Sequence, residues 1–209
     1  MLIPTTIAAV LPDAHRREIP ILAERYGTPR VEVVDLGTNR FAHPGDRRGR
    51  PGEVCMVIRR PSDRLLVFRK TFYPPGIHRL PTGGIHADEG IAQALERELY
   101  EETGLGIAAV RFLSLVAYRT TAGGADPVTV TYAFLLDDVA GTPVPVDPNE
   151  QVEEFRDVEV GDLLSIADQL DGLAPRPAPG LESNWHDWGR FRAVIHRVVW
   201  EELKNSPFE

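Results

Sequence analysis

The sequence predicts a mixed α/β domain rather than a regular alternation of strands and helices. Short runs of strand composition precede and follow one helical segment, in which Ile91, Leu95 and Leu99 recur at every fourth position. Two further helical segments lie near the C-terminus. The chain has 209 residues, of which 43% are hydrophobic and 26% charged, as in an ordinary globular protein. A chain of this length buries roughly 70% of its unfolded surface, so it needs no disulfide to fold.

The segments before the central helix are short. Residues 12–27 have the pattern of a polar helix, and residues 30–36 that of a strand. The stretch 43–52 is rich in Gly, Pro and charged residues, which predicts a loop. Three runs of strand composition follow, at 53–60, 64–70 and 78–80.

The segments after the central helix, which we expect at 91–102, alternate in type. Two longer strands come first, at 110–119 and 128–138, joined by a turn-rich loop. A third strand, a short helix, a Pro-rich linker and a last amphipathic helix follow, at 153–160, 161–170, 174–180 and 185–204. The apolar stripe of the last helix comprises Trp188, Phe191, Ile195, Val198 and Val199.

We expect this order of elements to divide the chain into three parts. Residues 1–50 form an N-terminal extension with a helix, a strand and a loop, and residues 51–172 form the central domain. Residues 173–209 form the linker and a C-terminal helix that packs on this domain or on a dimer partner. Because this helix carries more apolar surface than one small domain obviously needs, we expect a homodimer.

Composition argues against several classes of function. A formal net charge of −8 disfavours nucleic-acid binding, because Lys and Arg supply most of that affinity. No stretch approaches the roughly 18 apolar residues of a membrane-spanning helix, and the N-terminus lacks the basic region of a secretory signal. The single cysteine, Cys55, lies in an apolar run typical of a buried core residue. We therefore expect a cytoplasmic protein with no membrane or nucleic-acid partner.

Three glutamates on the central helix are the main candidates for chemistry. Glu98, Glu101 and Glu102 occupy positions i, i+3 and i+4, which places them on one face within about one turn. Like charges at this spacing weaken an isolated helix by about 0.2–0.5 kcal/mol per pair, which a solvated acidic face tolerates. Here the face adjoins the apolar Leu99, so the carboxylates border the core. A divalent cation such as Mg²⁺ would convert their repulsion into a ligand set.

The spacing around these glutamates is more specific than the cluster itself. Residues 83–105 read GGIHADEGIAQALERELYEETGL, which resembles the Nudix box, G-x5-E-x7-R-E-U-x-E-E-x-G-U, where U is a bulky aliphatic residue. The nine defined positions are filled by Gly83, Glu89, Arg97, Glu98, Leu99, Glu101, Glu102, Gly104 and Leu105. A chance match in a chain of this length is rarer than about one in a million. The resemblance implies a Nudix α/β/α sandwich with a mixed sheet, in which the box forms a loop, a helix and a loop.

The resemblance also implies roles for the box residues. Glu98 and Glu102 would be the principal Mg²⁺ ligands, Glu101 would assist, and the backbone carbonyl of Gly83 would complete the set, with Mn²⁺ as a substitute metal. Arg97 would orient carboxylates by charge-assisted hydrogen bonds. The remaining box residues are expected to be structural: Gly84, Glu89 (as the partner of Arg97), Leu99, Gly104 (as a helix cap) and Leu105.

The activity that this resemblance implies is hydrolysis of the diphosphate bond in a nucleoside diphosphate joined to another group. A bound metal would neutralise the diphosphate and acidify water, and a carboxylate would take the proton. Glu101 or Glu102 can be that base, and so can a glutamate on a later loop, for which Glu154 before Phe155 is the candidate, with Glu150 and Glu153 beside it. The N-terminal extension and the run RKTFYPPG favour an ADP-ribose or nucleotide-sugar type of substrate.

Residues outside the box are candidates for substrate binding. Arg69 and Lys70 end the strand before TFYPPG, where they can meet phosphates or lie in solvent. Tyr73 can stack on a base, as can Phe72 or Tyr118, or can pack in the core. His78 and His86 flank the box, but no second His or Cys gives either of them a zinc-site spacing.

Two other functions remain open at this point. An isomerase with the same fold fits poorly, because the only cysteine, Cys55, precedes the box and the box has its hydrolytic form. A nucleotide sensor that binds without turnover is the main alternative. The intact set of glutamates favours the hydrolase over the sensor.

Overall fold

The computed structural model describes residues 3–38, 50–121, 128–138, 141–178 and 183–204. Its helices are α1 (Thr5–Ala8), α2 (Asp13–Tyr26), α3 (Ile91–Thr103), α4 (Asp162–Asp171) and α5 (Trp185–Leu203), with a 3₁₀ turn, η2, at Pro148–Glu150. Its strands are β1 (Arg30–Asp35), β2 (Glu53–Arg59), β3 (Leu65–Lys70), β4 (Thr82–Gly84), β5 (Ile107–Arg119), β6 (Thr129–Asp138) and β7 (Val152–Val158).

The strands form one mixed sheet. Their order is β1-β5-β6-β2-β3-β7, and β4 pairs with β2 beside this path. The pairs β1/β5 and β2/β6 are parallel, and the other pairs are antiparallel. The mixed sheet of the predicted fold class is therefore confirmed.

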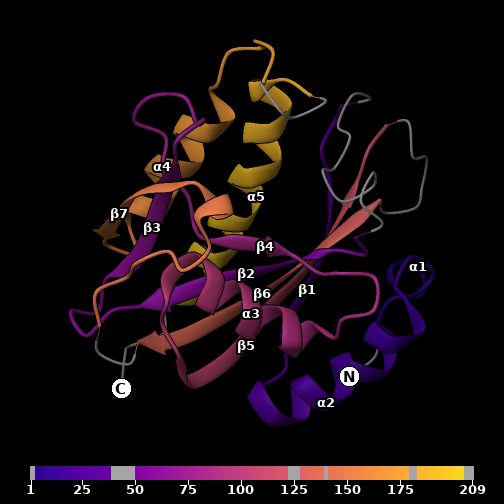
Figure 1. Ribbon diagram of the computed structural model, residues 1–209. Helices are drawn as coiled ribbons and strands as arrows, with labels where there is room; N and C mark the ends of the chain where they lie inside the picture. Colours follow the sequence, from indigo (N-terminus) through magenta and orange to yellow (C-terminus); the bar gives the residue numbers. More distant parts are fainter. Residues whose placement is uncertain (1–2, 39–49, 122–127, 139–140, 179–182, 205–209) are drawn as a thin grey trace.

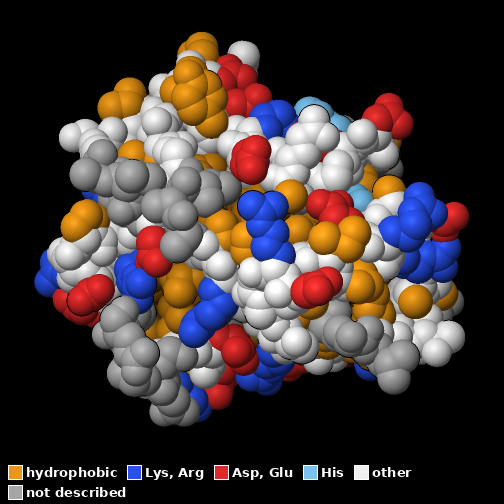
Figure 2. Space-filling view, turned by 90° about the horizontal axis from the view of Figure 1, so that it is seen from below, with side chains coloured by type: hydrophobic (Ala, Val, Ile, Leu, Met, Phe, Trp, Pro, Cys, Tyr) orange, Lys and Arg blue, Asp and Glu red, His pale blue; other side chains and the backbone are white. Residues whose placement is uncertain are grey.

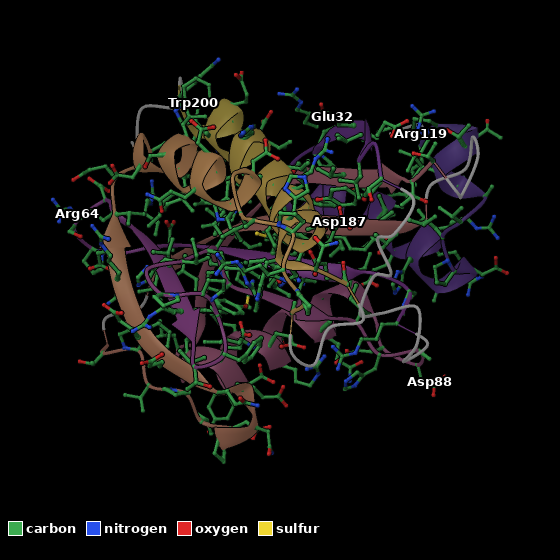
Figure 3. All side chains as sticks on the ribbon, turned by 90° about the horizontal axis from the view of Figure 1, so that it is seen from above. Glu32, Arg64, Asp88, Arg119, Asp187 and Trp200 are labelled. Atoms are coloured by element: carbon green, nitrogen blue, oxygen red, sulfur yellow. The ribbon has the colours of Figure 1, made fainter. Side chains whose placement is uncertain are left out.

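Helices cover both faces of this sheet, as Figure 1 shows: α2 and α3 lie on one side, and α4 and α5 on the other. Strand β2 contributes side chains to both apolar layers, because successive side chains of a strand point to opposite faces. Cys55 and Val57 join the core under α4 and α5, whereas Val54 and Met56 join the core under α2 and α3. In Figure 3, Trp200 of α5 and Asp88, just before α3, lie on opposite sides of the sheet.

The N-terminal extension is built into the start of α3. Gly90 occupies the N-cap position and offers no side chain to the first turn. Glu18 of α2 caps the N-terminus of α3 instead, because its carboxylate accepts hydrogen bonds from the backbone N–H groups of Ile91 (2.7 Å) and Ala92 (2.9 Å). At the other end, Gly104 adopts the left-handed conformation (φ 67°) expected of a helix cap.

Helix α5 buries its predicted stripe within its own chain. Trp188, Phe191 and Val199 are at most 3% exposed, and Tyr73 packs against Trp188 with ring centroids 5.0 Å apart. The apolar surface that suggested a homodimer is thus covered by the sheet and by α4. The homodimer stays a prediction, to be checked by a light-scattering mass of twice the 23.2 kDa of one chain.

Two short segments differ from the sequence prediction. In place of a strand at 78–80, Arg79 makes an isolated bridge with Phe68. The strand β4 was not expected, because Thr-Gly-Gly has no strand composition and is ordered here by backbone pairing with β2. Most of the predicted loop 43–52 and the end of the linker 174–180 lie outside the described residues.

The described surface shows no single-sign character on the face seen in Figure 2, where acidic and basic side chains are interspersed. None of the helices in the described ranges combines the length and the apolar character needed to cross a bilayer.

Candidate active site

A polar cleft lies where the end of β3, strand β4, helix α3 and the turn η2 meet. Its volume is about 290 Å³. It is lined by Arg50, Lys70, Thr82, Gly83, Gly84, His86, Arg97, Glu98, Glu101, Asp147 and Glu150. Most of the chemistry-bearing residues of the predicted box therefore share one cleft.

Carboxylates from two elements converge in this cleft. Glu98 and Glu101 come from α3, and Glu150 comes from η2. One carboxylate oxygen from each of the three lies within 4.8 Å of the others. The turn that carries Glu150 is fixed locally, because the Asp147 side chain accepts a 2.8 Å hydrogen bond from the N–H of Asn149.

Glu102 lies beneath this group and is completely buried. Lys70 joins the two levels, since its Nζ lies 2.9 Å from Glu102 Oε1 and 2.6 Å from Glu150 Oε2. Lys70 is the cation that pairs with the buried Glu102 carboxylate, and both residues contact Glu150. Two carboxylates thus share one lysine, so the charge of this pair of glutamates is only partly balanced by Lys70.

Burial and nearby charges shift the pKa values of these carboxylates in different directions. Burial raises the pKa of Glu102 to about 7, although Lys70 and Arg79 oppose the shift. Burial also raises the pKa of Glu98, against the effect of Arg97. Burial alone would raise the pKa of Glu150, but the ion pair with Lys70 lowers it overall. Glu98 and Glu102 therefore lose their protons less readily than free glutamates, whereas Lys70 favours the charged form of Glu150.

Arg97 organises the cleft side of α3. Its guanidinium donates to both oxygens of Glu89 (2.7 and 2.8 Å), to Glu98 (2.8 Å) and to Glu101 (2.9 Å). It also donates to the backbone carbonyl of Gly84 at 3.0 Å. These bonds raise the pKa of Arg97 and keep it charged. One planar fork thus fixes three carboxylates relative to strand β4.

The two glycines of β4 allow groups to approach closely. A methyl group at Gly83 would overlap the carboxyl group of Glu98, and one at Gly84 would overlap the guanidinium of Arg50. Gly83 therefore leaves room for the Glu98 carboxylate against the backbone. Arg50 lines the cleft, with its guanidinium beside Gly84.

Comparison with known families shows to which family the chain belongs. A family model described as NUDIX domain matches residues 49–182, which includes the cleft and both of its carboxylate-bearing elements. The chain belongs to the NUDIX family. The predicted central domain, 51–172, lies inside the matched range.

Two curated NUDIX relatives share only part of their length with this chain. The NAD-capped RNA hydrolase NudC of Photobacterium profundum is 27% identical over 123 residues, which are 58% of this chain and 41% of the relative. That of Shigella dysenteriae serotype 1 is 30% identical over 100 residues, which are 48% of this chain and 36% of the relative. The chain thus spans less than half the length of either relative.

Solved NUDIX structures are also similar. The MutT NUDIX hydrolase from Burkholderia pseudomallei has a TM-score of 0.46 at 20% identity, over 72% of this chain and 95% of that one. The NUDIX domain of Shewanella oneidensis NrtR, complexed with ADP ribose, has a TM-score of 0.44 at 19% identity, over 59% of this chain and 82% of that one.

A divalent cation fits the donors of the NUDIX cleft. The converging groups are hard carboxylate oxygens, which Mg²⁺ and Mn²⁺ prefer. The fully buried Glu102 shares Lys70 with Glu150, and the absent side chain of Gly83 leaves the Glu98 carboxylate against the backbone. Glu98, Glu101 and Glu150 are the residues that could hold the ion directly, with Glu102 behind them.

The structure does not bring every predicted residue to the cleft. Glu154 is exposed on β7, where it contacts Arg69 (3.2 Å) and His78 (3.3 Å) instead. Arg69 therefore faces Glu153 and Glu154, whereas the neighbouring Lys70 points into the cleft. Glu150 is therefore the later glutamate that lines this cleft, and Glu154 lies outside its lining; a catalytic part for Glu154 stays a prediction.

Two aromatic candidates are also placed elsewhere. Tyr73 is 7% exposed, its hydroxyl accepts a 2.6 Å hydrogen bond from Arg79, and its ring packs against tryptophans of α5. Tyr118 is fully buried against Phe191. Neither ring can stack on a base in this conformation, because each is enclosed by core residues.

Sequence reasoning did not single out Arg50, Thr82 or Asp147, which line the cleft, and it preferred Glu154 to Glu150. Arg50 was assigned to a loop, and nothing in its neighbourhood of Gly and Arg distinguishes the residue that lies over Gly84. Glu150 had a local signal, since Asp147-Pro148 is a helix start and orders the turn that carries it.

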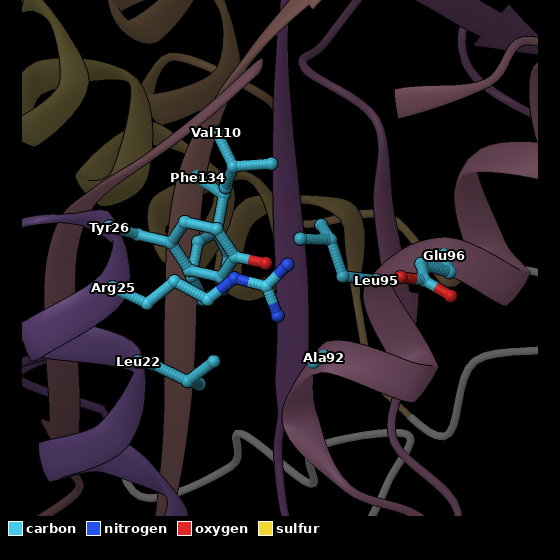
Figure 4. Close-up of a pocket in the computed structure, with 8 residues that line it drawn as sticks. All are labelled: Leu22, Arg25, Tyr26, Ala92, Leu95, Glu96, Val110 and Phe134. Carbon is cyan, nitrogen blue, oxygen red and sulfur yellow. The ribbon is translucent and has the colours of Figure 1, made fainter. Parts of the chain in front are cut away.

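A second cavity, of about 260 Å³, lies on another face of α3 and is shown in Figure 4. It is lined by Leu22, Arg25, Tyr26, Ala92, Leu95, Glu96, Val110 and Phe134. Its described lining offers one carboxylate, that of Glu96, so it does not resemble the acidic cleft. Glu96 is therefore a useful control for the cleft residues.

Proposed function

We propose that this protein is a Mg²⁺-dependent hydrolase of the diphosphate bond in a nucleoside diphosphate derivative. The observation that carries the proposal is the cluster of Glu98, Glu101 and Glu150 above the buried Glu102 in one cleft. A cluster this acidic, with Lys70 and Arg97 as its cations, is stabilised by a divalent ion and then becomes a site for an anionic substrate.

When bound, the metal would neutralise the diphosphate and lower the pKa of the attacking water. The chain's own groups supply the rest. Arg97 keeps Glu98 and Glu101 in fixed positions, so no reorganisation is needed as charge develops. The water proton passes to a carboxylate that retains access to the cleft, and Glu101 and Glu150 meet this condition whereas Glu102 is fully buried.

Substrate attraction requires local positive charge, because the chain carries a net charge of −8. Arg50 supplies it over Gly84, and its guanidinium can hold a phosphate oxygen pair in a bidentate manner. Lys70 is engaged by Glu102 and Glu150, so it serves mainly to keep those carboxylates in place. We assign the first contact with the diphosphate to Arg50.

The substrate class we favour is an ADP-ribose or nucleotide-sugar type of diphosphate. The sequence features behind this choice are the N-terminal extension and the segment after Lys70. The NudC relatives favour a second candidate, the diphosphate within NAD or an NAD cap on RNA. The net charge of −8 favours the free small molecule over the RNA.

The test is a substrate panel of ADP-ribose, UDP-glucose, NAD and NAD-capped RNA, with Mg²⁺ or Mn²⁺. We expect a nucleoside monophosphate as one product, loss of activity with EDTA, and ¹⁸O from water in only one of the two products. The cleavage proposal fails if no member of the panel is cleaved with either metal. Tight nucleotide binding without cleavage would establish the sensor in its place.

A further inference from the structure

Strand β4 is a short, glycine-rich part of the cleft wall. It consists of Thr82, Gly83 and Gly84, and it pairs with β2 beside the main order of the sheet. Glycine loses more conformational freedom on folding than any other residue. Gly83 nevertheless lies directly against the Glu98 carboxylate, so its position matters to the carboxylate cluster. Groups outside β4 must fix it.

Thr82 offers the only side chain by which β4 can be held from the buried side. Two arginines donate to its hydroxyl oxygen: Arg79 Nη1 at 2.8 Å and Arg192 Nη1 at 2.9 Å. A hydroxyl oxygen has two lone pairs, so both of its acceptor positions are occupied. Thr82 is 5% exposed, and water does not compete for these bonds. Its rotamer is fixed by two charged donors.

Arg192 brings the C-terminal helix to the cleft. It lies in α5, more than 80 residues after the box, and is 7% exposed. Glu53, at the start of β2, balances its charge at 2.7 Å and also accepts a 2.9 Å hydrogen bond from Thr131. Figure 1 shows α5 on one side of β4 and α3 on the other. The same guanidinium thus reaches the two strands β2 and β4.

The cleft side of β4 is held by a matching contact. Arg97 of α3 donates to the Gly84 carbonyl at 3.0 Å while it binds Glu98 and Glu101. Arg97 and Arg192 therefore form hydrogen bonds to the two ends of β4, and Gly83 lies between these ends. Loss of the Arg192 contact would leave Thr82 with Arg79 as its only arginine donor, without touching any carboxylate of the cluster.

We propose that Arg192 is a positioning residue of the cleft, which acts through Thr82 to hold Gly83 against Glu98. The inference rests on the proposed function, because it assigns Arg192 a part in forming the metal site. It predicts that the C-terminal helix contributes to metal affinity as well as to folding. Disturbed supporting contacts of metal sites typically weaken affinity or activity by about ten- to a hundredfold.

The test compares Thr82→Val, Thr82→Ser and Arg192→Lys with the wild-type protein and with Arg197→Ala. Arg197 lies on the same helix and pairs with Asp168 at the surface, so it is a matched control. Valine keeps the shape of Thr82 but removes the acceptor, whereas serine retains it. Each protein is titrated with Mn²⁺ alone by electron paramagnetic resonance, and its steady-state kinetics and thermal midpoint are measured.

We expect Thr82→Val and Arg192→Lys to weaken Mn²⁺ binding and to lower kcat/KM by about tenfold each, with Thr82→Ser recovering most of both. If both variants bind Mn²⁺ like Arg197→Ala and lose only thermal stability, the contact is structural and the inference is wrong. Thr82→Val decides the matter alone if Arg192→Lys does not fold. A wild-type protein that neither binds Mn²⁺ nor cleaves the panel would overturn the proposed function itself.

Discussion

The two sides of β4 carry charged clusters that are balanced to different degrees. On the cleft side, four glutamates lie close together, and burial raises the pKa of two of them, Glu98 and Glu102, although Arg97 and Lys70 contact them. On the α5 side, Arg192 is paired with Glu53. Arg192 donates to the hydroxyl of Thr82, and Glu53 accepts from the hydroxyl of Thr131.

This difference separates function from support. The buried pair of Arg192 and Glu53 brings two opposite charges together, so it needs no added ion for charge balance, although Arg192 Nε has no hydrogen-bond partner among the described residues. A group of carboxylates with excess charge is destabilised until a cation arrives, and structures retain such strain mainly at functional sites. The acidic cluster is therefore the place to test for chemistry, and the basic cluster is the place to test for positioning.

The largest effect is expected from Glu98→Gln. The change removes one charge from the centre of the cluster, so kcat should fall by about two or more orders of magnitude. The thermal midpoint should stay the same or rise, because like-charge repulsion is relieved. Steady-state kinetics and thermal unfolding measure the two effects. Glu96→Gln, on another face of the same helix, is the control, and near-normal turnover of Glu98→Gln would remove the cluster from the reaction.

A second comparison separates the two candidate glutamates of the later segment. Glu150→Gln should lower kcat by about tenfold or more, because Glu150 contacts Lys70 inside the cleft. Glu154→Gln should leave kcat within about twofold, since Glu154 is paired with Arg69 and His78 outside it. Kinetics of the matched pair measure this, and the opposite ranking would restore Glu154 as the functional residue.

These two glutamates also show how far the sequence could lead. The box spacing alone placed Glu98, Glu101 and Arg97 in one cleft, because a helix converts spacing into a shared face. The choice among the later glutamates needed the register of β7 against β3, which puts Glu154 opposite Arg69. Register depends on pairing between distant segments, and local composition does not encode it.

The same limit explains the other differences. For Tyr73 the sequence leaves base stacking and core packing open, and the C-terminal helix, more than 110 residues later, decides for the core by covering the ring with two tryptophans. Strand β4 could not be predicted, because Thr-Gly-Gly carries no strand signal. The hydrogen bonds from Arg79 and Arg192 to Thr82 could not be predicted either, because Arg192 comes from a distant element. Periodic helices and long strands were predicted well, since their signal is local.

A smaller effect is expected from Arg50→Ala. If Arg50 contacts the diphosphate in the ground state and the transition state alike, KM should rise by about tenfold while kcat changes little. The dependence of kcat/KM on ionic strength should also become weaker. Arg17→Ala, at an exposed position of α2, is the control. A fall in kcat with unchanged KM would instead assign Arg50 to the transition state alone.

The smallest effect concerns the buried side and appears in stability rather than activity. His196 is fully buried; its Nε2 accepts from the Leu80 N–H at 2.9 Å and its Nδ1 donates to the Arg192 carbonyl at 2.7 Å. Burial lowers its pKa to about 3, and the charges of Arg79, Arg192 and Arg197 add to the shift. Between about pH 3 and pH 6.5, the folded protein therefore keeps His196 neutral, whereas the same histidine binds a proton in the unfolded chain.

The sign of the pH effect follows from this difference. The stability contributed by neutral His196 is complete above the ordinary histidine pKa of about 6.5 and is lost as the pH falls towards 3, by up to about 1.4 kcal/mol per pH unit. Denaturant titrations of wild type and His196→Gln between about pH 7.5 and 4.5 measure it. Glutamine retains an acceptor for the Leu80 N–H but does not titrate, so the stability gap between the two proteins should narrow as the pH falls. A constant gap between wild type and His196→Gln would show that His196 does not titrate on unfolding.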